Sequence, residues 1–108
     1  MTSKEQKTRD RRILKFQEQP NAQTFHSGKF LKPTPQEIRE VRLFFDVTQV
    51  AMAKIVGVAW DAKQGSATVG SWEAIVGTKQ HRSIPYSAWR LFLIHVGVVG
   101  FEEGEELS

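Results

Sequence analysis

A chain of 108 residues with 40% apolar and 25% charged residues has the composition of one globular domain with a single hydrophobic core. It contains no cysteine, which excludes disulfide bonds, a thiol nucleophile and a cysteine-ligated zinc site. No apolar run approaches the about 20 residues of a membrane span, and residues 1–12 lack the apolar segment of a signal peptide, so we expect a cytoplasmic protein without a membrane partner.

The net charge of +3 is unevenly distributed along the chain. Residues 1–33 carry eight Lys or Arg against three acidic residues, whereas residues 101–108 carry four glutamates. This distribution suggests a polyanionic partner that approaches from one side, and two solvated termini are the alternative. We therefore divide the chain into a basic, partly ordered arm (1–33), a folded body (34–100) and an acidic tail (101–108).

The arm has no sustained apolar period. Ile13, Leu14 and Phe16 predict a short helical piece, after which proline and glycine residues interrupt the segment. Further apolar side chains are available to pin the arm onto the body, namely Phe25, Phe30 and Leu31.

The body begins with a clear helix start at residues 34–37, Thr-Pro-Gln-Glu, which form a capping box with proline at the first helical position. Apolar residues then recur at three- and four-residue spacing, which predicts one buried face: Ile38, Val41, Phe44 and Phe45. A second helix is predicted from a cap at Thr48 to a stop at Gly57.

Residues 58–66 are predicted to form a connecting loop, and residues 66–75 a short third helix with Val69, Trp72 and Ile75 on its inner face. A polar, basic loop follows Gly77, and a last helix is predicted from Tyr86 to about Val96, closed by Gly97. The predicted fold class is all-α, with four or five short helices.

The order of these motifs resembles the lambda-repressor-like (xenobiotic-response-element type) helix-turn-helix family, in particular its phage and mobile-element members. The resemblance covers about residues 34–99 and implies a compact DNA-binding domain that acts as a transcriptional regulator, as a dimeric repressor in the habit of the family. It is carried by Pro35-Gln36-Glu37-Ile38-Arg39, Arg42, Thr48-Gln49, Ala53, Gly57-Val58, Thr68-Val69, Trp72-Glu73, Ile84-Pro85-Tyr86 and Trp89-Arg90-Leu91-Phe92-Leu93.

The turn between the second and third helices departs from the family. Gly57 and Trp72 are fifteen positions apart, whereas about nine positions are usual in the helix-turn-helix motif that this chain resembles. The turn has therefore gained about six residues, within residues 59–64, and we expect this loop to enter or approach the DNA groove.

A helix laid in the major groove reads bases from its N-terminal turn, and the loop before it supplies longer donors. The predicted base-reading residues are Lys63, Gln64, Ser66, Ala67, Thr68 and Ser71. The start of the second helix offers free backbone N–H groups to a phosphate, and the resemblance implies further phosphate contacts after the third helix. The predicted phosphate contacts are Thr48, Gln49, Lys79, Gln80, His81 and Arg82.

The last helix is apolar on more than one side, which predicts an interface. We expect a homodimer that meets a palindromic operator with half-sites about one DNA turn apart. The predicted interface residues are Tyr86, Trp89, Phe92, Leu93, Val96, Val98 and Val99. The alternative is that residues 13–31 of the arm cover this helix within one chain.

Other residue patterns limit the chemistry. Three scattered histidines form no metal motif, and no nucleophile pairs with a base, so we expect no enzyme activity, no metal, no cofactor and no small-molecule ligand. Trp72 is expected in the core and Glu73 in a structural hydrogen bond, while Trp60 either covers the core or faces a partner. The alternative function is a protein-interaction module on the same scaffold, such as an antitoxin or a phage inhibitor of a host protein.

Overall fold

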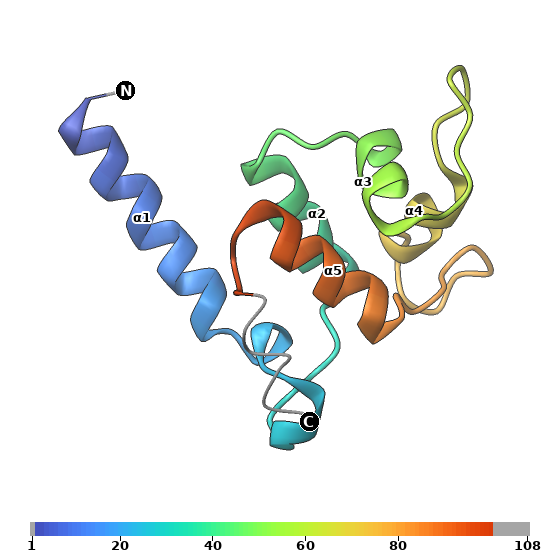
Figure 1. The fold of residues 1–108 in the computed structure, drawn as a ribbon. Helices are drawn as coiled ribbons and strands as arrows, with labels where there is room; N and C mark the ends of the chain where they lie inside the picture. Colours follow the sequence, from blue (N-terminus) through green and yellow to red (C-terminus); the bar gives the residue numbers. More distant parts are fainter. Residues whose placement is uncertain (1, 101–108) are drawn as a thin grey trace.

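A computed structural model describes residues 2–100, so the acidic tail 101–108 lies outside the described residues. The described chain is all-helical, as predicted, and holds five α-helices and two short 3-10 helices without a named strand (Figure 1). The elements in chain order are α1 (Ser3–Glu18), η1 (Pro20–Ala22), η2 (Phe25–Ser27), α2 (Pro35–Phe44), α3 (Gln49–Val56), α4 (Ala67–Trp72) and α5 (Tyr86–Val96).

The predicted caps define the helices of the body. The Thr34 hydroxyl accepts the Glu37 N–H at 3.1 Å, and the Glu37 carboxylate accepts the Thr34 N–H at 2.8 Å, which completes the capping box of α2. Thr48 caps α3, and Gly57 ends it in the left-handed conformation with φ +81°. The predicted last helix is confirmed as Tyr86–Val96 with Gly97 at its end.

Helix α5 passes through the centre of the body and packs with α3, which also packs on α4. Trp89, Phe92 and Leu93 of α5 are fully buried and join side chains from every α-helix in one core. The remaining buried apolar residues of this core are Phe16, Ala22, Ile38, Val41, Met52, Ala53, Val69, Trp72, Ile84, Val98 and Val99. The expectation that Trp72 is a core residue is confirmed.

The arm contains a longer helix than its apolar residues predict. Helix α1 spans sixteen residues and starts at a capping box in which the Thr2 hydroxyl accepts the Glu5 N–H at 3.2 Å. Phe16 is its buried residue and packs edge-on against the Phe44 ring, with ring centroids 5.3 Å apart. The prediction of a short piece was wrong because it relied on apolar periodicity, whereas caps and polar residues define most of this helix.

The segment after α1 covers α5. The Trp89 indole N–H donates to the Asn21 carbonyl at 3.0 Å, and the Arg90 guanidinium donates to the Ala22 carbonyl at 2.8 Å. The half-buried Tyr86 ring lies against Phe30, with centroids 4.9 Å apart and nearly perpendicular planes. The alternative in which the arm covers the last helix is therefore what the structure shows.

The predicted dimer interface on α5 is wrong for most of its residues, because they are buried within one chain. Their exposed fractions are 0% for Trp89, Phe92 and Val98, 1% for Leu93 and 8% for Val99. Tyr86 and Val96 are half-buried. An apolar surface wider than one stripe therefore reflects a helix enclosed on several sides by its own chain.

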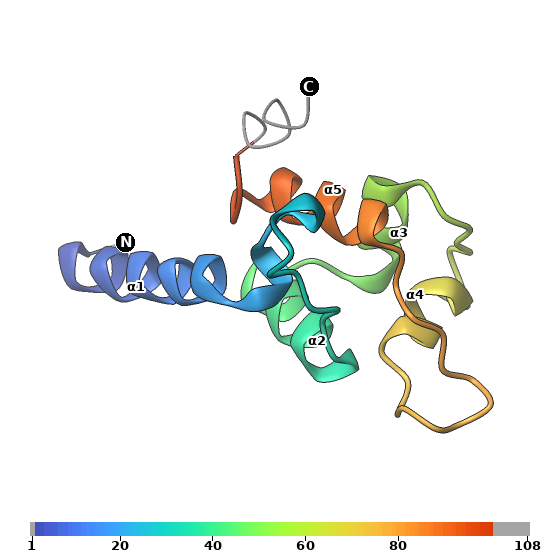
Figure 2. The ribbon, with the colours of Figure 1, turned by 90° about the horizontal axis from the view of Figure 1, so that it is seen from below.

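Helix α1 and helix α4 lie at opposite ends of the molecule (Figures 1 and 2). The first turns of α1 extend away from the body, while α4 and the loop before it form the other end. No helix of residues 2–100 is both long enough and apolar enough to cross a bilayer.

Candidate nucleic-acid interface

A buried ion pair ties α2 to the end of α4. The Arg42 guanidinium donates two hydrogen bonds to the Glu73 carboxylate, at 2.7 and 2.8 Å, and a third to the Val47 carbonyl at 2.9 Å. The two side chains are 8% and 6% exposed. The expectation of a structural hydrogen bond for Glu73 is confirmed, and the fork geometry of arginine fixes the angle at which α4 leaves the body.

The predicted phosphate contact Gln49 belongs to the same cluster. Its side-chain amide donates to the Glu73 carboxylate at 3.4 Å, and the residue is half-buried at the start of α3. Thr48 is exposed, and its hydroxyl accepts the Ala51 N–H at 3.0 Å. Both residues thus lie at the N-terminus of α3, but their side chains take part in structural hydrogen bonds.

The enlarged turn is an ordered hairpin, which we define as residues 59–65. Asp61 and Gly65 exchange two backbone hydrogen bonds, at 2.7 and 2.9 Å. The Asp61 carboxylate accepts the N–H groups of Lys63 and Gln64, both at 2.8 Å. Gly65 closes the hairpin with φ +82°, a conformation that glycine adopts without a steric penalty.

The turn also sets the protonation of its own carboxyl group. The backbone N–H groups of Gln64 and Lys63 hold the pKa of the exposed Asp61 carboxyl below its ordinary value. The charged form of Asp61 therefore favours the closed hairpin, with Lys63 and Gln64 exposed at its tip.

Trp60 is partly exposed, which answers the question that the sequence left open. Its side chain is 46% exposed, and the Lys54 ammonium of α3 lies 4.3 Å from the ring centroid. A cation at this distance from an indole face is in the range of cation–π attraction. The hairpin thus presents the Trp60 ring partly to solvent, with Lys54 packed over its face.

Helix α4 is shorter than predicted, and the side chain of Ser66 caps its N-terminus. It spans Ala67–Trp72 instead of residues 66–75. The Ser66 hydroxyl accepts the Val69 N–H at 3.2 Å and donates to the Ala59 carbonyl at 2.7 Å, and Ser66 is 3% exposed. Ser66 is therefore a helix cap that also anchors the hairpin, and its prediction as a base reader was wrong.

The other predicted base-reading residues are accessible to different extents. Lys63, Gln64 and Ala67 are exposed, while Thr68 and Ser71 are half-buried. The Ser71 hydroxyl donates to the Thr68 carbonyl at 2.6 Å. The hairpin and the N-terminal half of α4 also line a shared hollow of about 310 Å³, formed by Ala59, Trp60, Asp61, Gln64, Gly65, Ser66, Ala67 and Thr68.

The loop after α4 folds back onto it. The Arg82 N–H donates to the Ser71 carbonyl at 3.0 Å, and the His81 ring lies 3.0 Å from the Ala74 carbonyl. Lys79 and Gln80 are exposed at the bend of this loop. The structure thus places His81 and Arg82 next to the end of α4, where the Arg82 guanidinium donates to the Lys79 and His81 carbonyls at 2.8 and 2.7 Å.

Two apolar side chains follow α4 and face solvent. Ile75 is 77% exposed and Val76 is 66% exposed. The prediction that Ile75 lies on the inner face was wrong, because α4 ends at Trp72 and the next residues leave the helical path. Ile75 and Val76 border a hollow with the first turn of α2, whereas Trp60 lies with the hairpin at the N-terminal end of α4.

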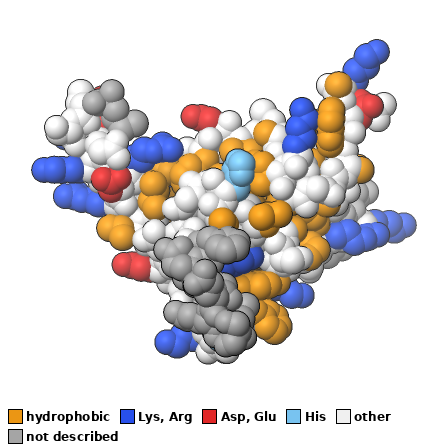
Figure 3. All heavy atoms as spheres, viewed as in Figure 1, with side chains coloured by type: hydrophobic (Ala, Val, Ile, Leu, Met, Phe, Trp, Pro, Cys, Tyr) orange, Lys and Arg blue, Asp and Glu red, His pale blue; other side chains and the backbone are white. Residues whose placement is uncertain are grey.

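Basic side chains project at both ends of the molecule, over α1 and around the α4 end (Figure 3). Among residues 2–100, no group of three His, Asp or Glu side chains could hold a metal ion. Sequence reasoning missed the partner of Glu73 and the order of the hairpin. Arg42 and Asp61 were visible in the sequence, but the contacts that define their roles depend on the fold.

No family model, no curated protein and no solved structure matches this chain.

Proposed function

We propose that this chain is a sequence-specific DNA-binding transcriptional regulator of the lambda-repressor-like type. The observation that carries the proposal is the joint presentation of the hairpin tip and the N-terminal half of α4 beside the buried Arg42–Glu73 pair. A short helix with a fixed orientation can place the side chains of its first turn against base edges in a major groove.

The side chains of this surface favour a combination of base contacts and phosphate contacts. Lys63 and Gln64 are the long donors at the hairpin tip, and an amide side chain can pair with adenine while an ammonium reaches guanine or phosphate. Thr68 and Ser71 offer hydroxyl groups that pair with several bases, and Ala67 suits a thymine methyl group. Lys79 and Arg82 supply charge to position the domain on the duplex without reading sequence.

We propose regulation by occupancy: the protein covers a promoter operator and represses transcription, as in the resembled phage and mobile-element regulators. A palindromic operator would bring two copies together on the DNA. Because the apolar face of α5 is buried by its own chain, such pairing would use another surface.

The test is selection of bound sequences from a random duplex pool at two salt concentrations, followed by binding measurements on the enriched sequence. Gln64→Ala and Thr68→Ala are each expected to cost about 1–3 kcal/mol at one base position. Lys79→Ala is expected to weaken enriched and scrambled duplexes alike, because a phosphate contact carries no sequence information.

Lys29→Ala is the matched comparison, because it removes an exposed lysine outside the proposed interface and changes the net charge by the same amount. A pool without any enriched sequence would overturn the proposal of specific reading. Equal loss on enriched and scrambled DNA for Thr68→Ala would remove that residue from the reading surface.

A protein-interaction module is the second candidate, and the exposed apolar side chains before and after α4 favour it. Trp60, Ile75 and Val76 are 46%, 77% and 66% exposed, and aromatic residues are enriched at protein interfaces. Binding to a protein partner that persists at high salt would support this function, since phosphate contacts weaken steeply as salt rises.

A further inference from the structure

Helix α1 carries a stripe of basic side chains that no acidic residue of the described chain pairs with. Lys4, Lys7, Arg11 and Lys15 follow one another at three- and four-residue spacing, so they share one face of the helix. All four are exposed. We call these four residues the α1 stripe.

Two of the three acidic groups of α1 have other partners, while the exposed Glu18 follows Lys15 on the same face. Glu5 accepts the Thr2 N–H, and Asp10 accepts the Gln6 amide at 2.9 Å. Within residues 2–100 the ion pairs are Arg12 with Glu40 and Arg42 with Glu73, and neither includes a stripe residue. Four like charges on one helix face repel one another, so an acidic partner would stabilise this face.

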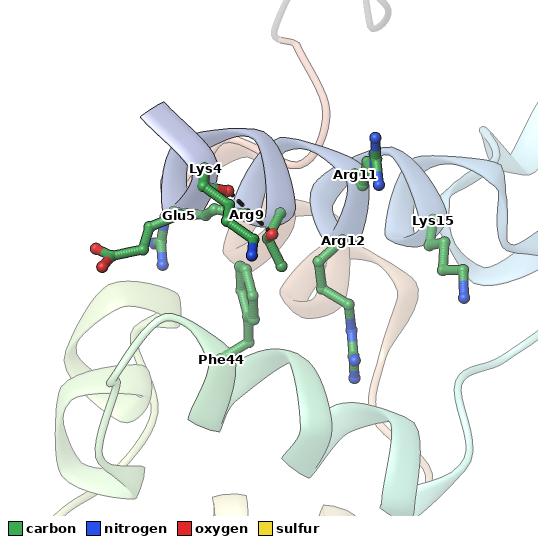
Figure 4. A pocket seen from close by; sticks show the side chains of 8 residues that line it. Lys4, Glu5, Arg9, Arg11, Arg12, Lys15 and Phe44 are labelled. Atoms are coloured by element: carbon green, nitrogen blue, oxygen red, sulfur yellow. Dashed lines mark hydrogen bonds between the residues drawn. The ribbon is translucent and has the colours of Figure 1, made fainter. Parts of the chain in front are cut away.

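The stripe borders the hollow between α1 and α2, because Lys4, Arg11 and Lys15 line this hollow together with Phe44 of α2 (Figure 4). In Figure 4, Arg12 and Phe44 point toward one another's helix across the gap between α1 and α2, whereas Arg11 points away from α2. Helices α1 and α4 lie at opposite ends of the molecule, so the stripe is a surface separate from the one around α4 (Figures 1 and 2).

The described chain ends next to this helix. Val98 and Val99 are buried in the same core cluster as Phe16 of α1. Both ribbon views show residues 97–100 beside the C-terminal end of α1 (Figures 1 and 2). The sequence then continues as Phe-Glu-Glu-Gly-Glu-Glu, with four carboxylates in residues 102–106.

We propose that residues 101–108 dock along the α1 stripe of the same chain. The charges match, with four cations on the stripe and four glutamates in the segment. The stripe is about 16 Å long at 1.5 Å per helical residue, and six extended residues span up to about 20 Å. The docked segment would keep the basic helix from binding nucleic acid or other polyanions without sequence preference, and this role does not depend on the proposed reading of DNA by α4.

The absence of cysteine allows a direct test on the full chain. A nitroxide label attached through Gly104→Cys broadens the amide NMR signals of residues that lie close to it. At low salt we expect residues 7–15 of α1 to lose more than half of their signal intensity relative to the reduced label. The broadening should vanish at about 1 M salt, where the Debye length falls to about 3 Å.

The matched variants are K7Q/R11Q, which removes two stripe charges, and K29Q/K32Q, which removes two exposed charges outside it. Glutamine is a good helix former, so α1 should persist in the first variant, and circular dichroism checks this. Loss of broadening in K7Q/R11Q, with full broadening in K29Q/K32Q, would support the docking.

Three results would overturn the proposal. The first is broadening of α1 no stronger than that of α4, and the second is equal broadening in K7Q/R11Q and the unchanged protein. The third is broadening of the α1 signals when isotope-labelled protein without a nitroxide is mixed with nitroxide-labelled protein. Broadening of equal strength in this mixture would show that residues 101–108 of a second copy bind α1. A heparin column gives a separate readout, because E102Q/E103Q/E105Q/E106Q should elute at higher salt than the unchanged protein.

Discussion

At the scale of single residues, the Arg42–Glu73 pair is the contact on which the candidate interface depends most. It joins α2 to the end of α4 from within the core, and Gln49 adds a third polar side chain. A buried pair is not by itself strong evidence for net stability, because both charges lose hydration. Its specific effect here is to fix one orientation of α4.

Glu73→Ala is expected to lower the free energy of unfolding by about 3–5 kcal/mol, because it leaves the Arg42 guanidinium buried without its carboxylate. Urea unfolding measures the change. Glu40→Ala is the matched control: it breaks the Arg12–Glu40 pair, whose side chains are 47% and 41% exposed, and should cost under about 1 kcal/mol. Equal losses in the two variants would show that the Arg42–Glu73 pair behaves as a surface contact.

Asp61 predicts a pH dependence of the hairpin. Its folded-state pKa lies below the ordinary value of 3.8, so its contribution to hairpin stability is present above that value. The contribution is lost as the pH falls through the folded-state pKa. The amide shifts of Lys63 and Gln64, followed by NMR, should report this loss.

The control is Asp61→Asn, which keeps an acceptor oxygen but does not titrate, so the same amide shifts should stay flat over this pH range. An Asp61 carboxyl that titrates at or above its ordinary value would contradict the role assigned to the N–H groups of Lys63 and Gln64.

At the scale of elements, the sequence predicted those helices whose ends are marked by local chemistry. The capping box at Thr34, the cap at Thr48 and the glycine stops at Gly57 and Gly97 were all readable and all confirmed. Helix α1 has an equally readable capping box at Thr2, but its polar surface hid it from a search for apolar periodicity. Cap chemistry was thus the more reliable signal in this chain.

Helix α4 offers a direct test of how much a helix of six residues depends on its surroundings. Gly70 lies in its interior, and an added Cβ would meet the Gln49 side-chain oxygen at 4.0 Å, an ordinary contact distance. Gly70→Ala is therefore expected to raise the free energy of unfolding by about 0.5–1 kcal/mol through helix propensity.

Gly97→Ala is the control for the Gly70 substitution. It also adds one methyl group in open space, but at φ +88°, where an L-residue is strained. It should lower the free energy of unfolding by about 1–2 kcal/mol. Urea unfolding of the two variants under the same conditions checks that they change stability in opposite directions.

At the scale of the whole molecule, the sequence showed the correct fold class but assigned the apolar face of α5 to the wrong partner. A helix that is apolar on several sides looks the same in sequence whether a second copy or its own chain covers it. The covering segment, residues 20–22, has little apolar character and uses backbone carbonyls to hold Trp89 and Arg90. Backbone contacts leave no residue pattern, so the sequence offered covering of α5 by the arm only as the alternative to a dimer.

Leu93→Ala separates the two arrangements. Leu93 is 1% exposed, so its truncation should cost about 2–5 kcal/mol of unfolding free energy. The urea midpoint should not change with protein concentration, whereas residues at a dimer interface make stability concentration-dependent. Leu91 of the same helix is 45% exposed, so Leu91→Ala should change the free energy of unfolding by no more than about 0.5 kcal/mol.

The contact of Asn21 and Ala22 with α5 also bears on where this fold can be shortened. A fragment starting at residue 34 would retain α2, α3, α4 and α5, yet its Trp89 indole N–H and Arg90 guanidinium would lose the carbonyl acceptors at Asn21 and Ala22. The buried Trp89 indole N–H that loses its acceptor costs about 1–3 kcal/mol of unfolding free energy. A shortened version of this fold should therefore keep residues 20–33, so that α5 retains these backbone acceptors.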